Sequence, residues 1–186
     1  MSENINILGF TGSLRRNSYN KAALNTAKKL LPEGSNLELV DLALIPFLNE
    51  DLEAEGIPPV VADFRKKIAS ADALLISTPE YNYSIPPVLK NALDWASRDK
   101  ERPLNGKLLA IVSASPSMFG GARAQYHLRQ VCVVLNLWVL NKPEVFITNA
   151  DKKFDQDGNL TDTHSREMLF RLLQALVDMA RELKKK

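Results

Sequence analysis

The chain has 186 residues, of which 45% are hydrophobic and 25% charged, and its formal net charge is +2. These values are ordinary for a globular protein, and no basic stripe interleaved with aromatic residues indicates nucleic-acid binding. At this length we expect one domain, formed by residues 1–186.

Cysteine content and hydropathy narrow the class further. Cys132 is the single cysteine, so an internal disulfide and a cysteine-ligated metal site are excluded, and its apolar surroundings predict a buried, inert thiol. The first residues do not read as a signal peptide, and no apolar run reaches the length of a membrane span. We therefore expect a cytoplasmic protein with no membrane partner.

Apolar runs of strand length alternate with helical patterns along the whole chain. Strands are expected at Ile5–Phe10, Leu37–Leu42, Ala73–Ser77, Leu108–Ser113 and, as one strand in two pieces around Pro143, at Val139–Leu140 and Val145–Thr148. Helices are expected at Asn20–Leu31, Val60–Ser70, Pro86–Ala96, Ala122–Leu135 and Asp162–Leu183. The segment Ala43–Pro59, which contains three prolines, is expected to be a loop.

This alternation predicts an α/β fold with a doubly wound parallel sheet in three layers. In such sheets ligands bind outside the carboxyl ends of the strands. The turns after the first, third and fourth strands are therefore the candidate site, and each has an unusual composition.

The first turn, Gly12–Asn20, has the chemistry of a phosphate site. It leads into a helix, whose N-terminus presents unpaired N–H groups and partial positive charge. Ser13, Ser18 and Asn20 add side-chain donors, and Arg15 adds a planar cation suited to phosphate oxygens. The alternative is an ordinary helix cap with solvated arginines.

The second and third turns suit a planar ligand. Thr78–Ser84 contains a proline, two tyrosines and Asn82, and could border a heterocycle through its backbone N–H groups; a surface loop or a dimer contact is the alternative. Ser113–Gly121 offers hydroxyls and two adjacent glycines, which permit close approach of the backbone to a ligand.

Several other chemistries have no signature in the chain. It contains no P-loop, no G-x-G-x-x-G after the first strand and no G-x-S-x-G nucleophile elbow. His127 and His164 fall outside the three turns in the sequence, and neither has a spaced partner typical of a metal site. We expect no metal and no catalytic side chain of the nucleophile or triad type.

Taken together, these stretches resemble the NAD(P)H-dependent FMN and quinone reductases, a flavodoxin-like family that includes chromate and azo-dye reductases. The resemblance runs through nearly the whole chain. It rests on Gly12-Ser13-Leu14-Arg15 with Ser18 and Asn20, on Pro79–Ser84, on Leu89–Trp95, and on Gly120–Arg123 with Tyr126–Arg129. One departure is visible, because Pro116-Ser117-Met118 stands where similar proteins often carry a glycine.

The resemblance implies a flavodoxin-like three-layer sandwich with strand order 2-1-3-4-5. It also implies a tightly but non-covalently bound FMN. The phosphate would be held by the first turn, through Ser13, Leu14, Arg15, Ser18 and Asn20. The flavin ring would be bordered by Pro79, Glu80, Tyr81 and Asn82, largely through main-chain groups, with Ser115 on its pyrimidine side.

The activity implied by the resemblance is electron transfer from NAD(P)H through FMN to quinones, free flavin, azo compounds or chromate, in a ping-pong order. The flavin carries this chemistry, so no catalytic side chain is assigned. Homodimers or homotetramers are implied, with Arg123, Tyr126 and Glu144 as interface candidates. An electron-carrying flavodoxin and a non-flavin anion-binding domain are the alternatives; a pI of about 8.6 and Arg15 argue against the first.

Overall fold

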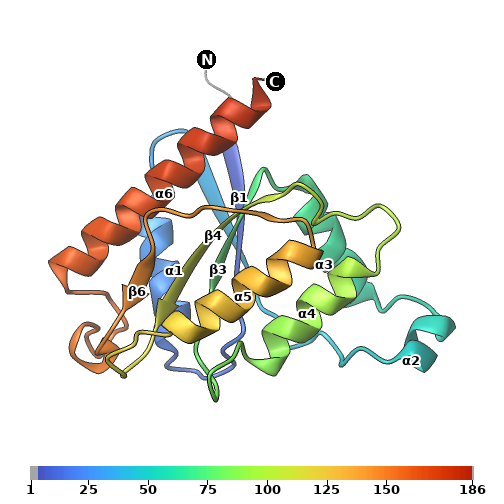
Figure 1. Ribbon diagram of the computed structural model, residues 1–186, viewed down its shortest axis with the longest axis horizontal. Coiled ribbons are helices and arrows are strands. Elements are labelled where there is room, and N and C mark those ends of the chain that lie inside the picture. Colours follow the sequence, from blue (N-terminus) through green and yellow to red (C-terminus); the bar gives the residue numbers. More distant parts are fainter. Residues whose placement is uncertain (1–3, 186) are drawn as a thin grey trace.

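Parallel strands form the centre of the computed structural model, which describes residues 4–185 (Figure 1). The sheet order is β2-β1-β3-β4-β5, and β6 also pairs with β4. The expected α/β class and the order 2-1-3-4-5 are confirmed. The strands are β1 (Ile5–Thr11), β2 (Ser35–Val40), β3 (Ala73–Ser77), β4 (Leu108–Ala114), β5 (Trp138–Val139) and β6 (Val145–Ile147).

The edge of the sheet beside β4 consists of two short strands. β5 pairs with Leu108 and Leu109, and β6 pairs with residues 112–114 of the same strand. The residues between them include the cis Lys142–Pro143 peptide. Proline cannot donate to a strand ladder, which explains the interruption. The expected fifth strand therefore exists in two pieces, counted as two strands. β5 has the predicted two residues but begins one residue earlier, and β6 ends one residue before the predicted end.

Within residues 4–185, six α-helices and one 3-10 turn, Ala150–Lys152, accompany these strands, and the last helix follows the final strand. The short helix within residues 43–59 corrects the prediction that this segment is a loop. Asn49 caps it by accepting from the Asp51 N–H, and none of its residues is buried. Without a buried face it has no apolar periodicity to detect. The helices are α1 (Tyr19–Lys29), α2 (Glu50–Glu55), α3 (Pro59–Ser70), α4 (Pro87–Ser97), α5 (Ala122–Val134) and α6 (Thr163–Lys184).

The two sheet faces carry separate hydrophobic cores because successive side chains of a strand point to opposite faces. On β1, Ile5 and Ile7 pack in the core under α1 and α6, whereas Leu8 and Phe10 pack in the core under α3, α4 and α5. Figure 1 shows these helices covering the two faces. Burial on both sides explains why the central strands read as continuous apolar runs.

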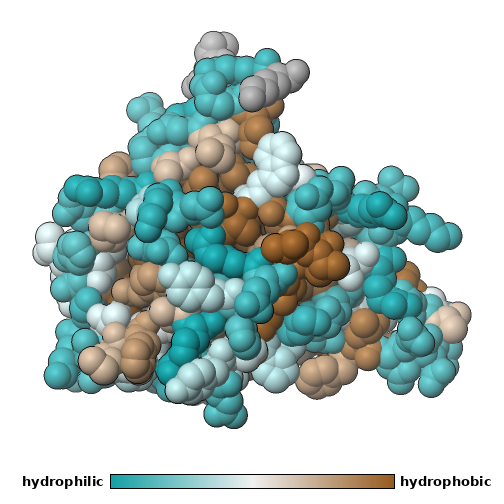
Figure 2. All heavy atoms as spheres, viewed as in Figure 1, coloured by the Kyte–Doolittle hydropathy of each residue, from teal (hydrophilic) through white to brown (hydrophobic). Residues whose placement is uncertain are grey.

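Hydrophobic side chains also gather on the outer surface of α5. Figure 2 shows them over the C-terminal end of this helix, where Val133 and Val134 are 80% and 83% exposed. Among residues 4–185, no helix combines the length and the apolar character needed to cross a membrane.

Candidate functional site

The turns that follow β1, β3 and β4 meet at one edge of the sheet, the lower edge in Figure 1. They enclose a small cavity of about 120 Å³. Eight of the ten predicted site residues line it, while the side chains of Leu14 and Asn82 do not. Its lining is Ser13, Arg15, Ser18, Tyr19, Asn20, Pro79, Glu80, Tyr81, Ala114, Ser115 and Pro116. Tyr19, Ala114 and Pro116 were not predicted as site residues; each directly adjoins a residue that was.

The first turn ends in a capped helix with a positive N-terminus. Ser18 is buried, and its Oγ accepts a hydrogen bond of 3.2 Å from the Lys21 N–H. The first turn of α1 contains no acidic residue, so nothing there neutralises the helix dipole. Arg15 adds a full positive charge; its Nη2 donates to the Asn17 carbonyl at 2.7 Å and its Cζ lies 5.7 Å from the Tyr19 ring centre.

Gly12 has a packing role at the beginning of this turn. A Cβ at this position would lie 2.3 Å from Pro86 Cγ and 2.8 Å from Leu89 Cβ. Because real Cβ atoms do not approach other atoms so closely, only glycine lets the turn pass over the beginning of α4. The sequence pattern that suggests phosphate binding is therefore also constrained by packing.

Asn20 connects the first turn to two strand ends. Its side chain is buried: Nδ2 donates to the Ala114 carbonyl at 2.9 Å, and Oδ1 accepts from the Ala114 N–H at 3.0 Å and from Ser77 Oγ at 2.9 Å. The side-chain amide thus pairs with the backbone of Ala114 at the end of β4 as a neighbouring strand would, and its bond to Ser77 fixes α1 relative to β3. This bridge is a role that the sequence did not reveal.

The second turn contains a tight hairpin. Tyr81 and Ser84 exchange two backbone hydrogen bonds of 2.9 and 3.0 Å, with Asn82 and Tyr83 between them at φ of 48° and 70°. Two positive φ values in a two-residue connection define a type I′ turn. Asparagine suits this conformation, whereas the bulky Tyr83 is strained there. Tyr81 and Tyr83 stay largely exposed, at 45% and 65%.

A charged clamp holds this hairpin against the third turn. The Glu80 carboxylate accepts hydrogen bonds from the Arg123 guanidinium and from the N–H groups of Arg123 and Ala124 at the beginning of α5. The Arg123 Cζ lies 3.8 Å from the Tyr83 ring centre and 4.5 Å from that of Phe119. The side-chain hydrogen bond with Glu80 raises the pKa of Arg123.

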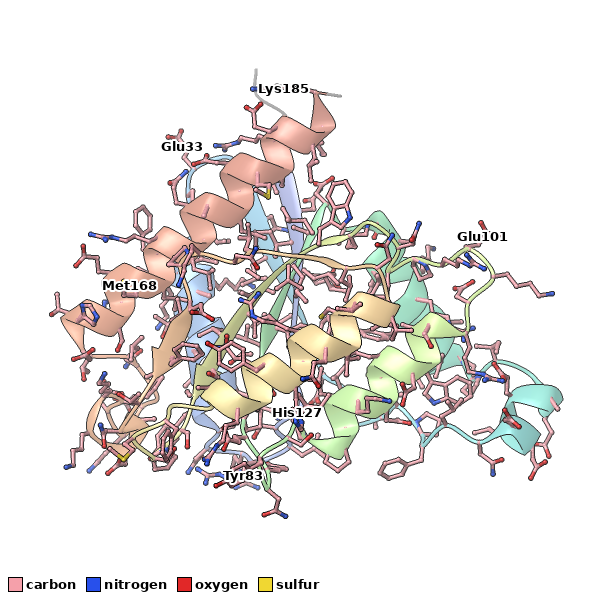
Figure 3. The ribbon with its side chains drawn as sticks, viewed as in Figure 1. Glu33, Tyr83, Glu101, His127, Met168 and Lys185 are labelled. Atoms are coloured by element: carbon pink, nitrogen blue, oxygen red, sulfur yellow. The ribbon has the colours of Figure 1, made fainter. Side chains whose placement is uncertain are left out.

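His127 also contacts the second turn, although it is distant from that turn in the sequence. Its Nδ1 lies 3.1 Å from Ser84 Oγ, and Figure 3 shows His127 on α5 and Tyr83 at the tip of the hairpin. The pairing depends on how α5 crosses the sheet, which residue spacing does not reveal.

The third turn is fixed from beneath by buried polar groups. Ser113 Oγ donates to the Gly120 carbonyl at 2.6 Å and accepts from Gln125 Nε2 at 2.8 Å. Gly121 has φ of 86°, and a Cβ there would lie 2.7 Å from Ser113 Cβ, so the paired glycines are required by the fold. Within residues 4–185, no three His, Cys, Asp or Glu side chains are grouped as metal ligands.

Comparisons with known proteins identify the family. The family model described as NADPH-dependent FMN reductase matches residues 5–152. The chain belongs to this family. A family member from Pseudomonas aeruginosa, named an NAD(P)H-dependent FMN reductase, is 54% identical over 99% of this chain and 100% of its own. An NAD(P)H:quinone oxidoreductase from Solanum tuberosum is 49% identical over 98% and 96%.

A solved structure agrees with this membership. The flavoenzyme NAD(P)H:(acceptor) oxidoreductase FerB from Paracoccus denitrificans superposes with a TM-score of 0.87, at 31% identity, over 96% of this chain and 98% of its own. This FMN reductase family member is therefore an oxidoreductase, with FMN as cofactor and NAD(P)H as co-substrate. An enzyme of this family is a better description than an electron-carrying flavodoxin.

Proposed function

We propose that this chain holds FMN at the three converging turns and uses it to oxidise NAD(P)H. The observation that carries the proposal is that these turns line one cavity at the positive end of α1. The proposed FMN contacts are those implied by the family resemblance: Ser13, Leu14, Arg15, Ser18, Asn20, Pro79, Glu80, Tyr81, Asn82 and Ser115.

The first turn fits a phosphate group. Two buried hydroxyls, Ser13 and Ser18, stand beside a helix N-terminus with no acid in its first turn, and Arg15 supplies the countercharge. Backbone N–H groups and a dipole at a helix N-terminus favour an anion. Removing this phosphate from water is offset by the charge-assisted hydrogen bonds that Arg15 can donate.

The second turn fits the edge of a planar ring. A cavity of about 120 Å³ is smaller than the roughly 300 Å³ or more of sites that enclose a ligand. The ring would therefore lie at the mouth of the cavity, along Pro79 to Asn82, with one face open. Glu80 and Arg123 keep this hairpin rigid, which limits the ordering cost when the ring binds.

When bound, FMN would accept hydride from NAD(P)H and pass the electrons to a second substrate in a ping-pong order. The chain's own residues would position the cofactor and hold its phosphate. The proposed acceptors are quinones, free flavin, azo compounds and chromate. An open ring face supports this breadth, because it offers few contacts that would discriminate between acceptors.

We also propose a homodimer or homotetramer of this single-domain chain, located in the cytoplasm. The exposed Val133, Val134 and Trp138 support self-association, since surfaces of this kind mark protein contacts. Two of the polar interface candidates already have partners in the chain: Arg123 pairs with Glu80 and Glu144 with Lys142. Tyr126 is 51% exposed.

The test is a titration of the apoprotein with FMN, in which binding is measured by the quenching of flavin fluorescence. Arg15→Ala should weaken FMN affinity about 10- to 100-fold, the loss of a charge-assisted hydrogen bond. Lys66→Ala, which removes an exposed cation on α3, should leave the affinity unchanged. Equal affinity of wild type and Arg15→Ala would remove Arg15 from the site. No thermal protection by FMN would refute the proposal.

A further inference from the structure

A second and larger cavity, of about 540 Å³, lies on the other side of the first turn. It is bounded by the beginning of α1 and by residues of the segment 151–158, which begins within the 3-10 turn and continues into the loop after it. It shares Arg15, Ser18 and Tyr19 with the smaller cavity. A group anchored at this turn therefore borders both spaces.

The walls of this cavity carry opposite charges. Arg15, Arg16 and Lys21 lie on the α1 side, and Asp151, Asp155 and Asp157 lie on the loop side. Asp155 is engaged in its own loop, because its carboxylate accepts from the N–H groups of Asp157 and Asn159. The carboxylates of Asp151 and Asp157 therefore remain to face the cations across the cavity.

These facing charges do not satisfy one another. Within residues 4–185, the side chains of Arg16, Lys21, Asp151 and Asp157 make no hydrogen bond or ion pair. The space between the walls thus offers cations for an anionic group and carboxylates for hydroxyl or amino donors, which are complementary features of a single nucleotide.

An aromatic surface completes the lining. Tyr19 is half-buried in the cavity, and its ring centre lies 5.4 Å from that of Phe154 with 34° between the planes. A flat apolar surface beside charged groups suits a heterocycle. The volume lies within the range of about 300–1,000 Å³ that is usual for small-molecule sites.

We propose that this cavity binds the adenosine-phosphate part of a dinucleotide. Arg16 and Lys21 would hold a phosphate, Asp151 and Asp157 would accept from ribose hydroxyls, and Tyr19 would contact the adenine. The assignment rests on the proposed function, which places a flavin phosphate at the shared turn. The adenosine phosphate has two sources, a flavin dinucleotide continuing from that phosphate or NAD(P)H.

ADP is the probe, titrated by calorimetry into protein saturated with FMN. We expect saturable binding that Lys21→Glu and Arg16→Glu each weaken at least tenfold, because each replaces a cation with a like charge facing the phosphate. Lys28→Glu is the matched control, as Lys28 is exposed on the same helix but outside the cavity, and it should bind ADP like wild type. Thermal midpoints of the variants establish that each is folded.

Two further measurements distinguish the sources. If the source is a flavin dinucleotide, the apoprotein binds FAD more tightly than FMN, and Lys21→Glu abolishes the difference. If it is NAD(P)H, ADP competes with it, and Lys21→Glu raises KM without changing kcat. ADP binding with neither response would overturn the dinucleotide assignment.

Absence of ADP binding, displacement of FMN by ADP, or equal weakening by Lys28→Glu would overturn the site itself. A failure of the proposed function is distinguishable, because it is seen as absent FMN binding in the separate fluorescence titration.

Discussion

The Asn20 bridge should contribute measurably to stability. Asn20→Ala leaves three buried groups without their partner: the Ala114 N–H, the Ala114 carbonyl and the Ser77 hydroxyl. An unsatisfied buried polar group costs about 1–3 kcal/mol, and water entering the vacated space recovers part of it. We therefore expect a loss of about 2–5 kcal/mol in the free energy of unfolding.

Urea denaturation of the apoprotein measures this loss without the contribution of a ligand. With a slope of about 2 kcal/mol per molar urea, the midpoint should fall by roughly 1–2.5 M. Asn25→Ala is the control, because Asn25 is exposed on the same helix and its side chain makes no hydrogen bond within residues 4–185. It should change stability by no more than about 0.5 kcal/mol, in the stabilising direction. An Asn20→Ala midpoint equal to that of wild type would refute the role of the bridge.

Three other changes probe separate parts of the fold. Gly12→Ala should cost about 1–3 kcal/mol, seen as a lower urea midpoint, because its methyl group would collide with Pro86; unchanged stability would mean that the turn yields freely. Hydrogen bonds from Ser165 hold the pKa of Asp162 in the folded protein below its ordinary 3.8. The ionised Asp162 therefore stabilises the fold fully at pH values above its pKa in the unfolded chain, and this stabilisation is lost as the pH falls through its pKa in the folded protein. In a denaturation series, the advantage of wild type over Asp162→Asn should therefore decline as the pH falls below about 4 and disappear at still lower pH; an advantage that stays constant down to strongly acid pH would contradict this assignment. Burial raises the pKa of Cys132 to about 12, so a thiol reagent at about pH 8 should label the urea-unfolded chain and spare the native one; rapid native labelling would show that the thiol is accessible.

The strand pattern and the three turns could be predicted because each has a local signal. A strand buried on both faces, such as β3, is apolar throughout, and hydroxyl-rich or glycine-rich turns interrupt these runs. The rule that ligands bind at carboxyl strand ends then brings distant turns together without knowledge of side-chain contacts. This rule explains why eight of the residues predicted from separate turns line one cavity.

The features that escaped prediction depend on contacts between distant segments. Glu80 and Arg123 are 43 residues apart, and nothing local indicates that they pair. The hydrogen bonds from Asn20 to Ala114 depend on where α1 crosses the sheet, which no local pattern shows. The larger cavity exists because the loop around Asp155 packs beside α1, a contact between segments that are far apart in the sequence.

The most direct test of the central claim is to add NADH or NADPH anaerobically to the FMN-loaded protein and to measure the flavin absorbance. Because the account makes FMN the group that NAD(P)H reduces, at least one nucleotide should bleach the flavin absorbance promptly, and a quinone added afterwards should restore it. A bound flavin that keeps its absorbance with both nucleotides would contradict the account.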